Sequence, residues 1–451
     1  MQTNFSPEQL FDPDTATSES IIRKCVHCGF CTATCPTFVE LGDELDSPRG
    51  RIYLLKEMLE KDKPATQEVV KHIDRCLSCL SCMTTCPSGV HYGHLVDHGR
   101  AHIEETYRRP WHDRAIRALL AQVLPYRNRF RVALLASVPG RLLKPLLAGI
   151  PAARPLAAML DLAPVMPPAR SATEGAQTFA AEGARLKRVA LLSNCAQPVV
   201  APQINEATIR LLNRHGVEVV IAKGEGCCGA IVHHMGREDQ AKALARRTID
   251  AWIAEMDGEG LDAIVVNVSG CGTTVKDYGH LFREDPDYAE KAARISAIAR
   301  EVSEVMDDIG LMAPAIEVGL TAAYHSACSM QHGQRVQAPP RALLRAAGYA
   351  VKEIPESHLC CGSAGTYNIL QPEIAGRLRR RKASNIESVA PDVVATGNVG
   401  CITQIAKGTS IPIVHTVELL DWATGGPVPV ALEGTALASR VSPVTVLEAA
   451  E

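Results

Sequence analysis

The sequence has little net charge, no export signal and no long apolar run, and each absence excludes a class of protein. Its 47 Lys and Arg nearly balance 50 Asp and Glu, for a formal net charge of −3, so the electrostatic footprint of a nucleic-acid-binding protein is missing. The first residues are polar and acidic and have neither the basic nor the apolar region of a signal peptide, so we expect a cytoplasmic protein. No uninterrupted apolar run reaches the roughly eighteen residues of a membrane span, so we expect none.

Cysteine is the residue that the sequence has in excess. The 451 residues include 16 cysteines, and clustered thiols in a reducing compartment usually bind metal or carry out redox chemistry. The sequence has neither a Walker A loop nor a GxSxG elbow. A Gly224-x-Gly226-x-x-Gly229 pattern fits the dinucleotide fingerprint, but Cys227 and Cys228 occupy its variable positions. We therefore predict no nucleotide site and no catalytic side chain, and no cofactor in this chain other than metal centres.

Eight of the cysteines form two short runs of the same design. Each run has the spacing Cys-x2-Cys-x2-Cys-x3-Cys-Pro, which is typical of bacterial ferredoxins with two [4Fe–4S] clusters. In that arrangement the fourth cysteine of each run ligates the cluster of the other run. The predicted ligands are Cys25, Cys28, Cys31 and Cys86 for the first cluster, and Cys76, Cys79, Cys82 and Cys35 for the second. Two zinc knuckles are the alternative, but two complete runs that both end in proline favour the clusters.

The residues around the two runs predict a mainly helical domain over 1–110. About forty residues separate the runs, and apolar residues between 52 and 59 recur at helical spacing. A small β-sheet ferredoxin has a much shorter insert, so we expect the helical form of the two-cluster domain. A histidine stripe follows the second run, at His91, His94, His98 and His102. We interpret it as an exposed or cluster-shielding helix face rather than a haem or metal site.

The next segment, 111–184, is predicted to be a basic helical connector rich in Leu, Ala and Pro. Between 107 and 170 the chain has eleven Arg or Lys against only two Asp and no Glu. Amphipathic helices are expected over 115–124 and 132–147, with prolines interrupting them. Their apolar faces either pack on this protein or a partner subunit, which we favour, or dock on anionic lipid heads at a membrane surface.

The remaining eight cysteines form two matched sets. They are Cys195, Cys227, Cys228 and Cys271, followed by Cys328, Cys360, Cys361 and Cys401. The offset between the sets is 133 residues at the first three positions and 130 at the last, which indicates a duplicated unit. Strands alternate with helices in both units, including strands at 217–222 and 349–354, and this order predicts parallel sheets. We predict two tandem α/β units, over 185–320 and 321–451.

Each of these cysteines is expected just past the carboxyl end of a strand, where open α/β sheets form ligand sites. Four thiolates from three loops can enclose one metal centre in each unit, so both sets are candidate metal ligands. Buried cysteines that are only small apolar core residues are the alternative, but the adjacent Cys-Cys pair in both units disfavours it. His233, His234 and His325 lie nearby, and we expect ordinary hydrogen-bonded histidines there.

The whole pattern resembles a known family. Two ferredoxin runs followed by two Cys-Cys-Gly units are similar to the iron–sulfur subunits of membrane-associated 2-hydroxy-acid and glycerol-3-phosphate dehydrogenases. The resemblance is strongest to the iron–sulfur subunits of glycolate oxidase (glycolate dehydrogenase), and it covers nearly the whole chain. It includes local sequence at 25–31, 47–51, 227–230 and 287–294.

This resemblance implies a division of labour between subunits. The flavin and the hydroxy-acid site would lie in separate FAD-binding subunits, which oxidise glycolate to glyoxylate. This chain would hold two [4Fe–4S] clusters and pass electrons towards quinone or another membrane acceptor, and not to NAD or oxygen. A flavin takes two electrons from a hydroxy acid whereas a cluster carries one at a time, so the clusters would serve as a one-electron wire. Peripheral contact with the cytoplasmic face of the inner membrane stays open.

The Cys-Cys-Gly units also resemble those of heterodisulfide reductase, where the pattern closes with CxxC. Here Val268 and Asn398 replace the first cysteine of that closing pair, so each unit has four cysteines rather than five. One further iron–sulfur cluster, a zinc ion and no metal are therefore all open for these units. The competing hypotheses are an iron–sulfur subunit of lactate or anaerobic glycerol-3-phosphate dehydrogenase, a catalytic subunit like heterodisulfide reductase, and a zinc-bound scaffold without redox activity.

Overall fold

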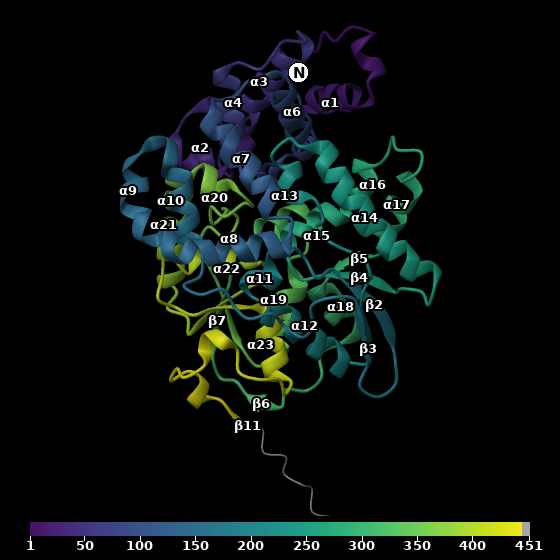
Figure 1. Cartoon of the computed structure of the whole chain (residues 1–451), viewed down its shortest axis with the longest axis vertical. Coiled ribbons are helices and arrows are strands. Elements are labelled where there is room, and N and C mark those ends of the chain that lie inside the picture. Colours follow the sequence, from purple (N-terminus) through teal and green to yellow (C-terminus); the bar gives the residue numbers. More distant parts are fainter. Residues whose placement is uncertain (444–451) are drawn as a thin grey trace, which may run out of the picture.

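The N-terminal part of the chain is helical, as predicted. The computed structural model describes residues 1–443, and Figure 1 shows the N-terminal helices gathered at one end of the molecule. Its α-helices are α1 (Pro13–Lys24), α2 (Pro36–Leu41), α3 (Pro48–Glu60), α4 (Gln67–Asp74), α5 (Ser81–Thr85) and α6 (Tyr92–Thr106). The predicted helix between the runs is α3, which begins where the Ser47 side chain accepts a hydrogen bond from the Gly50 amide at 3.0 Å. Pro48 takes the first helical position, where its missing N–H is not needed.

The connector is also helical, and it carries a feature that the sequence analysis did not predict. Its helices are α7 (Trp111–Val123), α8 (Arg127–Gly140), α9 (Lys144–Gly149) and α10 (Arg154–Leu162). Within the described residues, one helical segment, Arg127–Gly149, is long and apolar enough to cross a membrane by length and composition, and only 6% of its most apolar stretch is buried. The segment meets this criterion by average hydropathy although Arg141 and Lys144 interrupt its apolar run, and the expectation of no membrane span stays a prediction.

The first Cys-Cys-Gly unit contains a five-stranded sheet in the order β1-β3-β2-β4-β5. The strands are β1 (Gln177–Phe179), β2 (Lys187–Leu191), β3 (Val217–Ile221), β4 (Ala263–Val266) and β5 (Ala299–Glu301). All neighbours are parallel except β1, which pairs antiparallel with β3. The helices are α11 (Gln197–Val200), α12 (Gln203–Arg214), α13 (Ala230–His233), α14 (Glu238–Asp257), α15 (Ser269–Lys276), α16 (Tyr278–Leu281), α17 (Ala289–Ile298) and α18 (Val302–Ile309).

The second unit repeats this topology. Its parallel sheet has the order β10-β9-β7-β8, which matches β5-β4-β2-β3 strand for strand. The strands are β7 (Thr321–Tyr324), β8 (Ala350–Glu353), β9 (Val393–Thr396) and β10 (Ile413–His415), and a small antiparallel pair joins β6 (Ile316–Glu317) to β11 (Ser442–Pro443). The helices are α19 (Ala338–Ala346), α20 (Tyr367–Leu370), α21 (Pro372–Glu387), α22 (Val399–Ile405) and α23 (Thr416–Ala423).

Two details of the repeat differ from the sequence-based expectation. Each sheet has a further strand, β5 or β10, that follows the third predicted strand of its unit. The last cysteine of each set was expected in a loop, but Cys271 lies in the first turn of α15 and Cys401 in the first turn of α22. The start predicted for the first unit, residue 185, falls after β1, which already belongs to its sheet.

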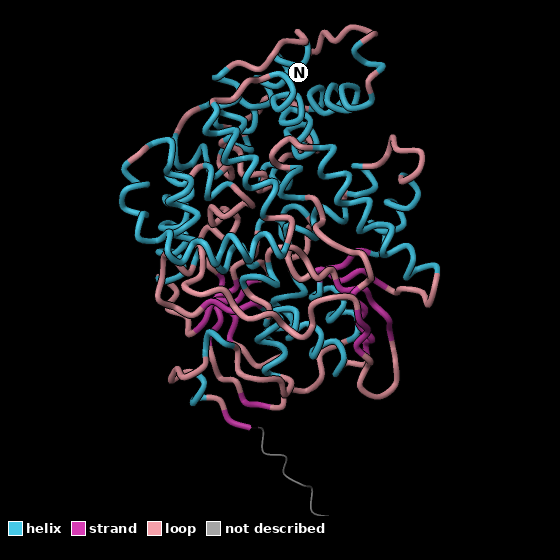
Figure 2. The backbone as a smooth tube through the Cα atoms, viewed as in Figure 1, coloured by secondary structure: helices cyan, strands magenta, loops and turns pink. Residues whose placement is uncertain are grey.

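The two units share one hydrophobic core. Helix α12 of the first unit packs against α23 of the second, and α18 of the first packs against α19 of the second. Buried residues of both sheets, such as Leu191, Val265, Ala322 and Val393, belong to the same apolar cluster. Figure 2 shows the two sheets side by side beneath the helical region. The units are thus repeats in sequence and a single packed body in space.

Candidate metal centres

Two cavities lie among the helices of residues 1–110, and cysteines line both. The cysteines of the first cavity are Cys25, Cys28, Cys31, Cys82 and Cys86, and those of the second are Cys35, Cys76, Cys79 and Cys82. The fourth cysteine of each run therefore lies with the first three cysteines of the other run. The structure brings together both predicted ligand sets in the crossed arrangement, while metal binding itself stays a prediction.

The same backbone shape presents the thiols of both runs. In the first run His27 and Gly29 have φ angles of 59° and 90°, and in the second run Ser78 and Leu80, at the equivalent positions, have 49° and 61°. A left-handed conformation costs a non-glycine residue roughly 1–2 kcal/mol, and such strain typically persists at ligand sites. A Cβ atom at Gly29 would also lie 2.5 Å from the Arg49 guanidinium. The CxxCxxC loops therefore keep a strained backbone conformation, which is typical of ligand sites.

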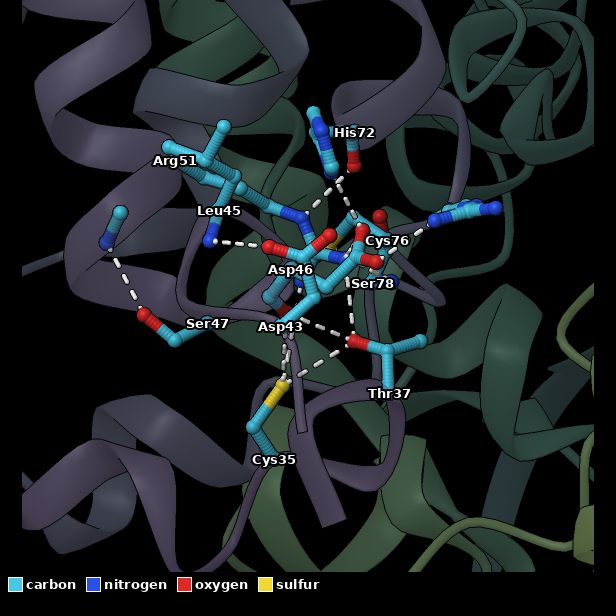
Figure 3. Close-up of polar contacts among 12 residues, drawn as sticks. Cys35, Thr37, Asp43, Leu45, Asp46, Ser47, Arg51, His72, Cys76 and Ser78 are labelled. Carbon is cyan, nitrogen blue, oxygen red and sulfur yellow. Dashed lines mark hydrogen bonds and ion pairs between the residues drawn. The ribbon is translucent and has the colours of Figure 1, made fainter. Parts of the chain in front are cut away.

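A buried charge network surrounds the second cavity (Figure 3). The guanidinium of Arg51 lies 3.8 Å from the Cys35 sulfur and donates a 2.9 Å hydrogen bond to the Thr37 hydroxyl. Asp46 is fully buried, and its carboxylate lies 2.9 Å from His72 Nδ1 and 3.4 Å from Arg51. Burial opposes the charge of Arg51, but neighbouring groups, Cys35 and Asp46 among them, raise its pKa. A fixed cation therefore lies beside a sulfur ligand of the predicted second cluster. The sequence analysis identified residues 47–51 only as a segment that resembles the family, and it predicted no role for Arg51.

The two ferredoxin sites differ in their contact with solvent. Cys28 of the first set is exposed, whereas Cys79 of the second set is buried. Burial raises the pKa of Cys79 and of Cys82 well above that of an ordinary thiol. Free thiols there would stay protonated at neutral pH, so a bound metal ion is needed to hold them as thiolates.

Each Cys-Cys-Gly motif ends in a glycine that the packing requires. Gly229 and Gly362 have φ angles of 88° and 90°, and a Cβ atom would lie 2.8 Å and 2.7 Å from the carbonyl oxygens of Ala241 and Ala375. In both motifs the glycine amide also donates a 3.4 Å hydrogen bond to the sulfur of the first cysteine. The cysteines of each unit come from the ends of three strands, as predicted, so the two candidate sites share one architecture.

The second unit lies directly against the second ferredoxin site. Cys79 and Cys360 belong to one apolar cluster with Tyr367, and Cys328 packs on its edge. The Cys328 and Cys360 sulfurs are 3.7 Å apart. This juxtaposition joins positions about 280 residues apart in the chain, and no sequence pattern indicated it.

The loop residues reinforce this contact. The Thr84 hydroxyl, between Cys82 and Cys86, forms a 2.7 Å hydrogen bond with His332 Nδ1. The other ring nitrogen of His332 lies 3.1 Å from the carbonyl oxygen of His358, which is two residues before Cys360 in the second Cys-Cys pair. A continuous polar link thus accompanies the apolar contact between the two sites.

The predicted histidine stripe does not converge on one centre. His91, His94 and His280 stack, with ring centroids 3.7 Å and 3.4 Å apart, between α6 and α16 of the first unit. His98 forms a hydrogen bond with Ser18, and His102 contacts the backbone of residue 63. The stripe therefore forms interfaces along its helix, which is closer to the interpretation as a packing face than to a metal site.

The three histidines predicted near the Cys-Cys-Gly sites, His233, His234 and His325, differ in their surroundings. His233 Nδ1 lies 3.9 Å from the Asp97 carboxylate, whereas His234 forms a 3.4 Å hydrogen bond with the same carboxylate, which fits the expectation of an ordinary hydrogen-bonded histidine. His325 does not fit it, because neither ring nitrogen has a hydrogen-bond partner within residues 1–443, although the side chain is buried. Burial lowers the pKa of His325 to about 3, so its ring is neutral.

Comparisons with known proteins agree with this architecture. A 4Fe-4S dicluster domain matches residues 21–90, and a cysteine-rich domain matches residues 189–276 and again 322–406. The chain is 40% identical to the glycolate oxidase iron-sulfur subunit of Escherichia coli K12, over 94% of this chain and 99% of that one. It is 30% identical to a probable glycolate oxidase iron-sulfur subunit of Bacillus subtilis, over 90% and 95% of the two chains.

Two further matches are more distant. Lactate utilization protein A of Bacillus subtilis is 28% identical over 52% of this chain and 99% of its own length. A solved structure of a hypothetical protein from Helicobacter pylori superposes with a TM-score of 0.51 at 9% identity, covering 92% of this chain and 73% of that chain. This last likeness concerns the fold alone.

Proposed function

Because this chain belongs to the family of the glycolate oxidase iron–sulfur subunits, we propose that it is the electron-transfer subunit of a glycolate dehydrogenase complex. Partner subunits with FAD oxidise glycolate to glyoxylate, and this chain carries the electrons towards quinone or another membrane acceptor. The observation that carries the proposal is the crossed gathering of eight cysteines around two adjoining cavities.

The residues present fit two [4Fe–4S] clusters. Each cavity has four sulfur donors of the crossed set, and no carboxylate of residues 1–443 lines either cavity. One histidine, His27, lines the first cavity, and its Nε2 lies 3.3 Å from the carbonyl oxygen of Arg49. Bound clusters supply one-electron redox chemistry. We propose Cys25, Cys28, Cys31 and Cys86 as ligands of the first cluster, and Cys76, Cys79, Cys82 and Cys35 as ligands of the second.

Side chains of this chain would set the potentials and insulate the path. The buried guanidinium of Arg51 stabilises negative charge on the sulfur of Cys35, which favours the reduced form of the second centre. Tyr92 donates a 3.7 Å hydrogen bond to the Cys76 sulfur and acts in the same direction. The apolar contact between Cys79 and Cys360 excludes water between the second ferredoxin site and the second Cys-Cys-Gly site.

The exposed side of the first site suits a partner that delivers electrons. Val26 and Phe30, which flank the exposed Cys28, are 67% and 64% exposed. Apolar side chains around an exposed metal ligand favour a protein partner that seals the site from water. We propose that the FAD-binding subunit docks on this surface, formed by Val26, Cys28 and Phe30.

The connector suits the other end of the path, at the membrane. Leu142, Leu143 and Leu146 are 86%, 55% and 65% exposed, and basic residues flank them. Leucines in water beside Arg and Lys are typical of helices that lie in a lipid headgroup region. We propose that this connector surface, Leu142, Leu143 and Leu146, holds the chain on anionic lipid at the cytoplasmic face of the inner membrane.

Vesicle sedimentation tests the membrane contact. The full chain should pellet with vesicles that contain anionic phospholipid, and a Leu142→Ser, Leu146→Ser variant should stay in the supernatant. Val430→Ser is the matched control, because Val430 is 57% exposed on the second unit, away from the connector. If the variant loses binding to the FAD subunits and keeps binding to vesicles, the connector surface is a subunit interface and the lipid proposal is wrong.

Iron analysis tests the function itself. Anaerobically purified protein should contain at least about eight iron and eight acid-labile sulfide per chain, with cluster signals in EPR after dithionite reduction. Mixed with its FAD-binding partners, it should support glycolate-dependent reduction of a quinone analogue. Turnover with lactate or glycerol 3-phosphate instead would favour the competing dehydrogenases, and zinc without iron would overturn the proposal.

A further inference from the structure

His325 is a buried side chain whose chemistry no contact among residues 1–443 accounts for. It follows β7 directly, and its backbone amide is held by the carbonyl oxygen of Ala395 at 2.8 Å. Its side chain is only 2% exposed, and both ring nitrogens lack a hydrogen-bond partner among residues 1–443. Buried polar groups are almost always paired, so an imidazole without partners needs an explanation.

Another buried histidine of the same unit shows what ordinary packing provides. His415 is 1% exposed, and its Nε2 lies 2.9 Å from the carbonyl oxygen of Asn267 while its Nδ1 accepts a 3.1 Å hydrogen bond from the Val417 amide. Both of its nitrogens are used. The lone pair of His325 is therefore an exception within its own domain.

Two cysteine sulfurs lie close to the His325 ring. A ring nitrogen of His325 and the sulfurs of Cys361 and Cys401 all lie within 4.8 Å of one another. These three residues come from the ends of three different strands, and the remaining cysteines of the set, Cys328 and Cys360, adjoin them. Nitrogen and sulfur donors that converge in a buried space are typical of iron–sulfur and zinc sites.

The first unit lacks this nitrogen. The offset of 133 residues that relates Cys195 to Cys328 relates Leu192 to His325. Leu192 is fully buried within an apolar cluster, so its position is part of the core and offers no donor. The two units therefore share their cysteines but differ in one candidate ligand.

The second unit also carries a buried cation that suits an anionic centre. Lys382 is 2% exposed, and its ammonium donates a 2.9 Å hydrogen bond to the carbonyl oxygen of Glu356. Burial lowers the pKa of Lys382, and negative charge on Cys361, Cys360 and Cys401 acts in the opposite direction. A buried ammonium with only a carbonyl partner is costly, and a cluster held by thiolates would provide the missing negative charge.

We propose that His325 is a ligand of an iron–sulfur cluster held by the cysteines of the second unit, Cys328, Cys360, Cys361 and Cys401. The first unit, with Leu192, has sulfur ligands alone. This inference rests on the proposed electron-transfer function. His325 adds a nitrogen donor to four thiolates and replaces none of them, and the centre lies beside the second ferredoxin site.

Pulsed EPR on the full chain tests the ligand directly. Protein labelled with 15N-histidine, prepared anaerobically and poised where the centre is paramagnetic, should show a strongly coupled nitrogen whose splitting changes with the isotope. His325→Leu should remove this coupling. His358→Leu is the matched control, since it lies in the loop before the Cys-Cys pair and outside the donor group, and it should leave the coupling unchanged.

His325→Cys gives a second readout that does not depend on the loss of a ligand. The introduced thiolate should keep the iron content of the wild type while the nitrogen coupling disappears and the potential of that centre falls. An unchanged potential and spectrum in this variant would overturn the proposal. So would zinc in the second unit, or iron above about eight per chain without a coupled histidine nitrogen.

The failure of this inference can be told from the failure of the proposed function. About eight iron per chain with active electron transfer and no histidine signal would remove the ligand role of His325 and leave the electron-transfer function standing. A chain without iron would remove both.

Discussion

The two ferredoxin sites are built on the same backbone but lie in opposite surroundings. Both use paired left-handed residues between their cysteines, so the local architecture is a copy. The first site opens to solvent at Cys28, whereas the second is enclosed by the Arg51 network on one side and by Cys360 on the other. The comparison teaches that the surroundings of the two sites are set by their position and not by the motif, since one opens to solvent and the other faces the interior of this chain.

The largest expected effect comes from removing the cation of the enclosed site. Arg51→Gln leaves the carboxylate of Asp46 with fewer partners inside the protein, and breaking a buried pair costs about 3 kcal/mol or more. The free energy of unfolding should fall by about that amount, and the second cluster should become harder to reduce. Denaturant titration and a redox titration followed by EPR measure the two effects.

Arg49→Gln is the matched control for this variant. Arg49 forms an ion pair with Glu44 beside the open site, at 2.6 Å and partly in solvent. Such a surface pair is worth less than about 1 kcal/mol. Equal losses in the two variants would contradict the distinction between an open and an enclosed site.

The next effect concerns the partner at the open site. A Val26→Ser, Phe30→Ser variant should weaken binding of the FAD-binding subunit by about 2 kcal/mol, or roughly thirtyfold in Kd, because it removes two apolar anchors. Titration calorimetry with the partner subunit measures the change. Iron content should stay at the wild-type value, and Val430→Ser should bind normally; unchanged affinity in the double variant would exclude this surface as the docking site.

A smaller effect is expected in the pH dependence of stability. It comes from His280, which stacks on His94 where α6 of the helical domain meets α16 of the first unit. Burial and the neighbouring His94 lower the pKa of His280 to about 4, whereas an unfolded histidine titrates near 6.5. Between these two pH values His280 binds a proton in the unfolded chain but not in the folded chain. The free energy of unfolding is therefore unaffected by this group above about pH 6.5, and it falls as the pH drops towards 4.

With partial solvent screening we expect a loss of about 1 kcal/mol between pH 7 and pH 5. His280→Gln should reduce this slope, because the amide does not titrate in that range. Unfolding curves at both pH values compare the two proteins. If the slopes are identical, the stacked histidines do not control the acid sensitivity of that interface.

The smallest expected effect lies at the interface of the enclosed site. Thr84→Val removes the hydrogen bond to His332, which is worth about 0.5–1 kcal/mol at a partly exposed position. Thr85→Val is the control, because it removes the same hydroxyl from the neighbouring residue of α5. Denaturation of both variants measures the difference, and a larger loss at Thr85 would refute the role of the Thr84 link.

Sequence reasoning was strongest where spacing alone carries the chemistry. The crossed gathering of Cys35 and Cys86 and the position of each later cysteine at a strand end follow from motif spacing and from the geometry of parallel sheets. The short strands β5 and β10 were not predicted, because three residues are too few to show the alternation of apolar and polar residues that marks a strand.

Contacts between side chains far apart in the sequence could not be predicted. Nothing in the sequence links Cys79 to Cys360, because their contact depends on how the helical domain packs on the second unit. The isolation of His325 was equally invisible, since a histidine near a cysteine usually has a polar partner. Such facts require coordinates for both partners.

The shared core of the two units has a consequence for their symmetry. The contact of α12 with α23 and that of α19 with α18 are the same contact made twice, with the roles of the units exchanged. Reciprocal contacts of this kind define a homodimer closed by a twofold axis, here joined into one chain. A dimer of identical chains must carry the same residue at both equivalent positions. Fusion lifts that restriction, so a leucine and a histidine can occupy one symmetric position and give two copies of a site different ligands.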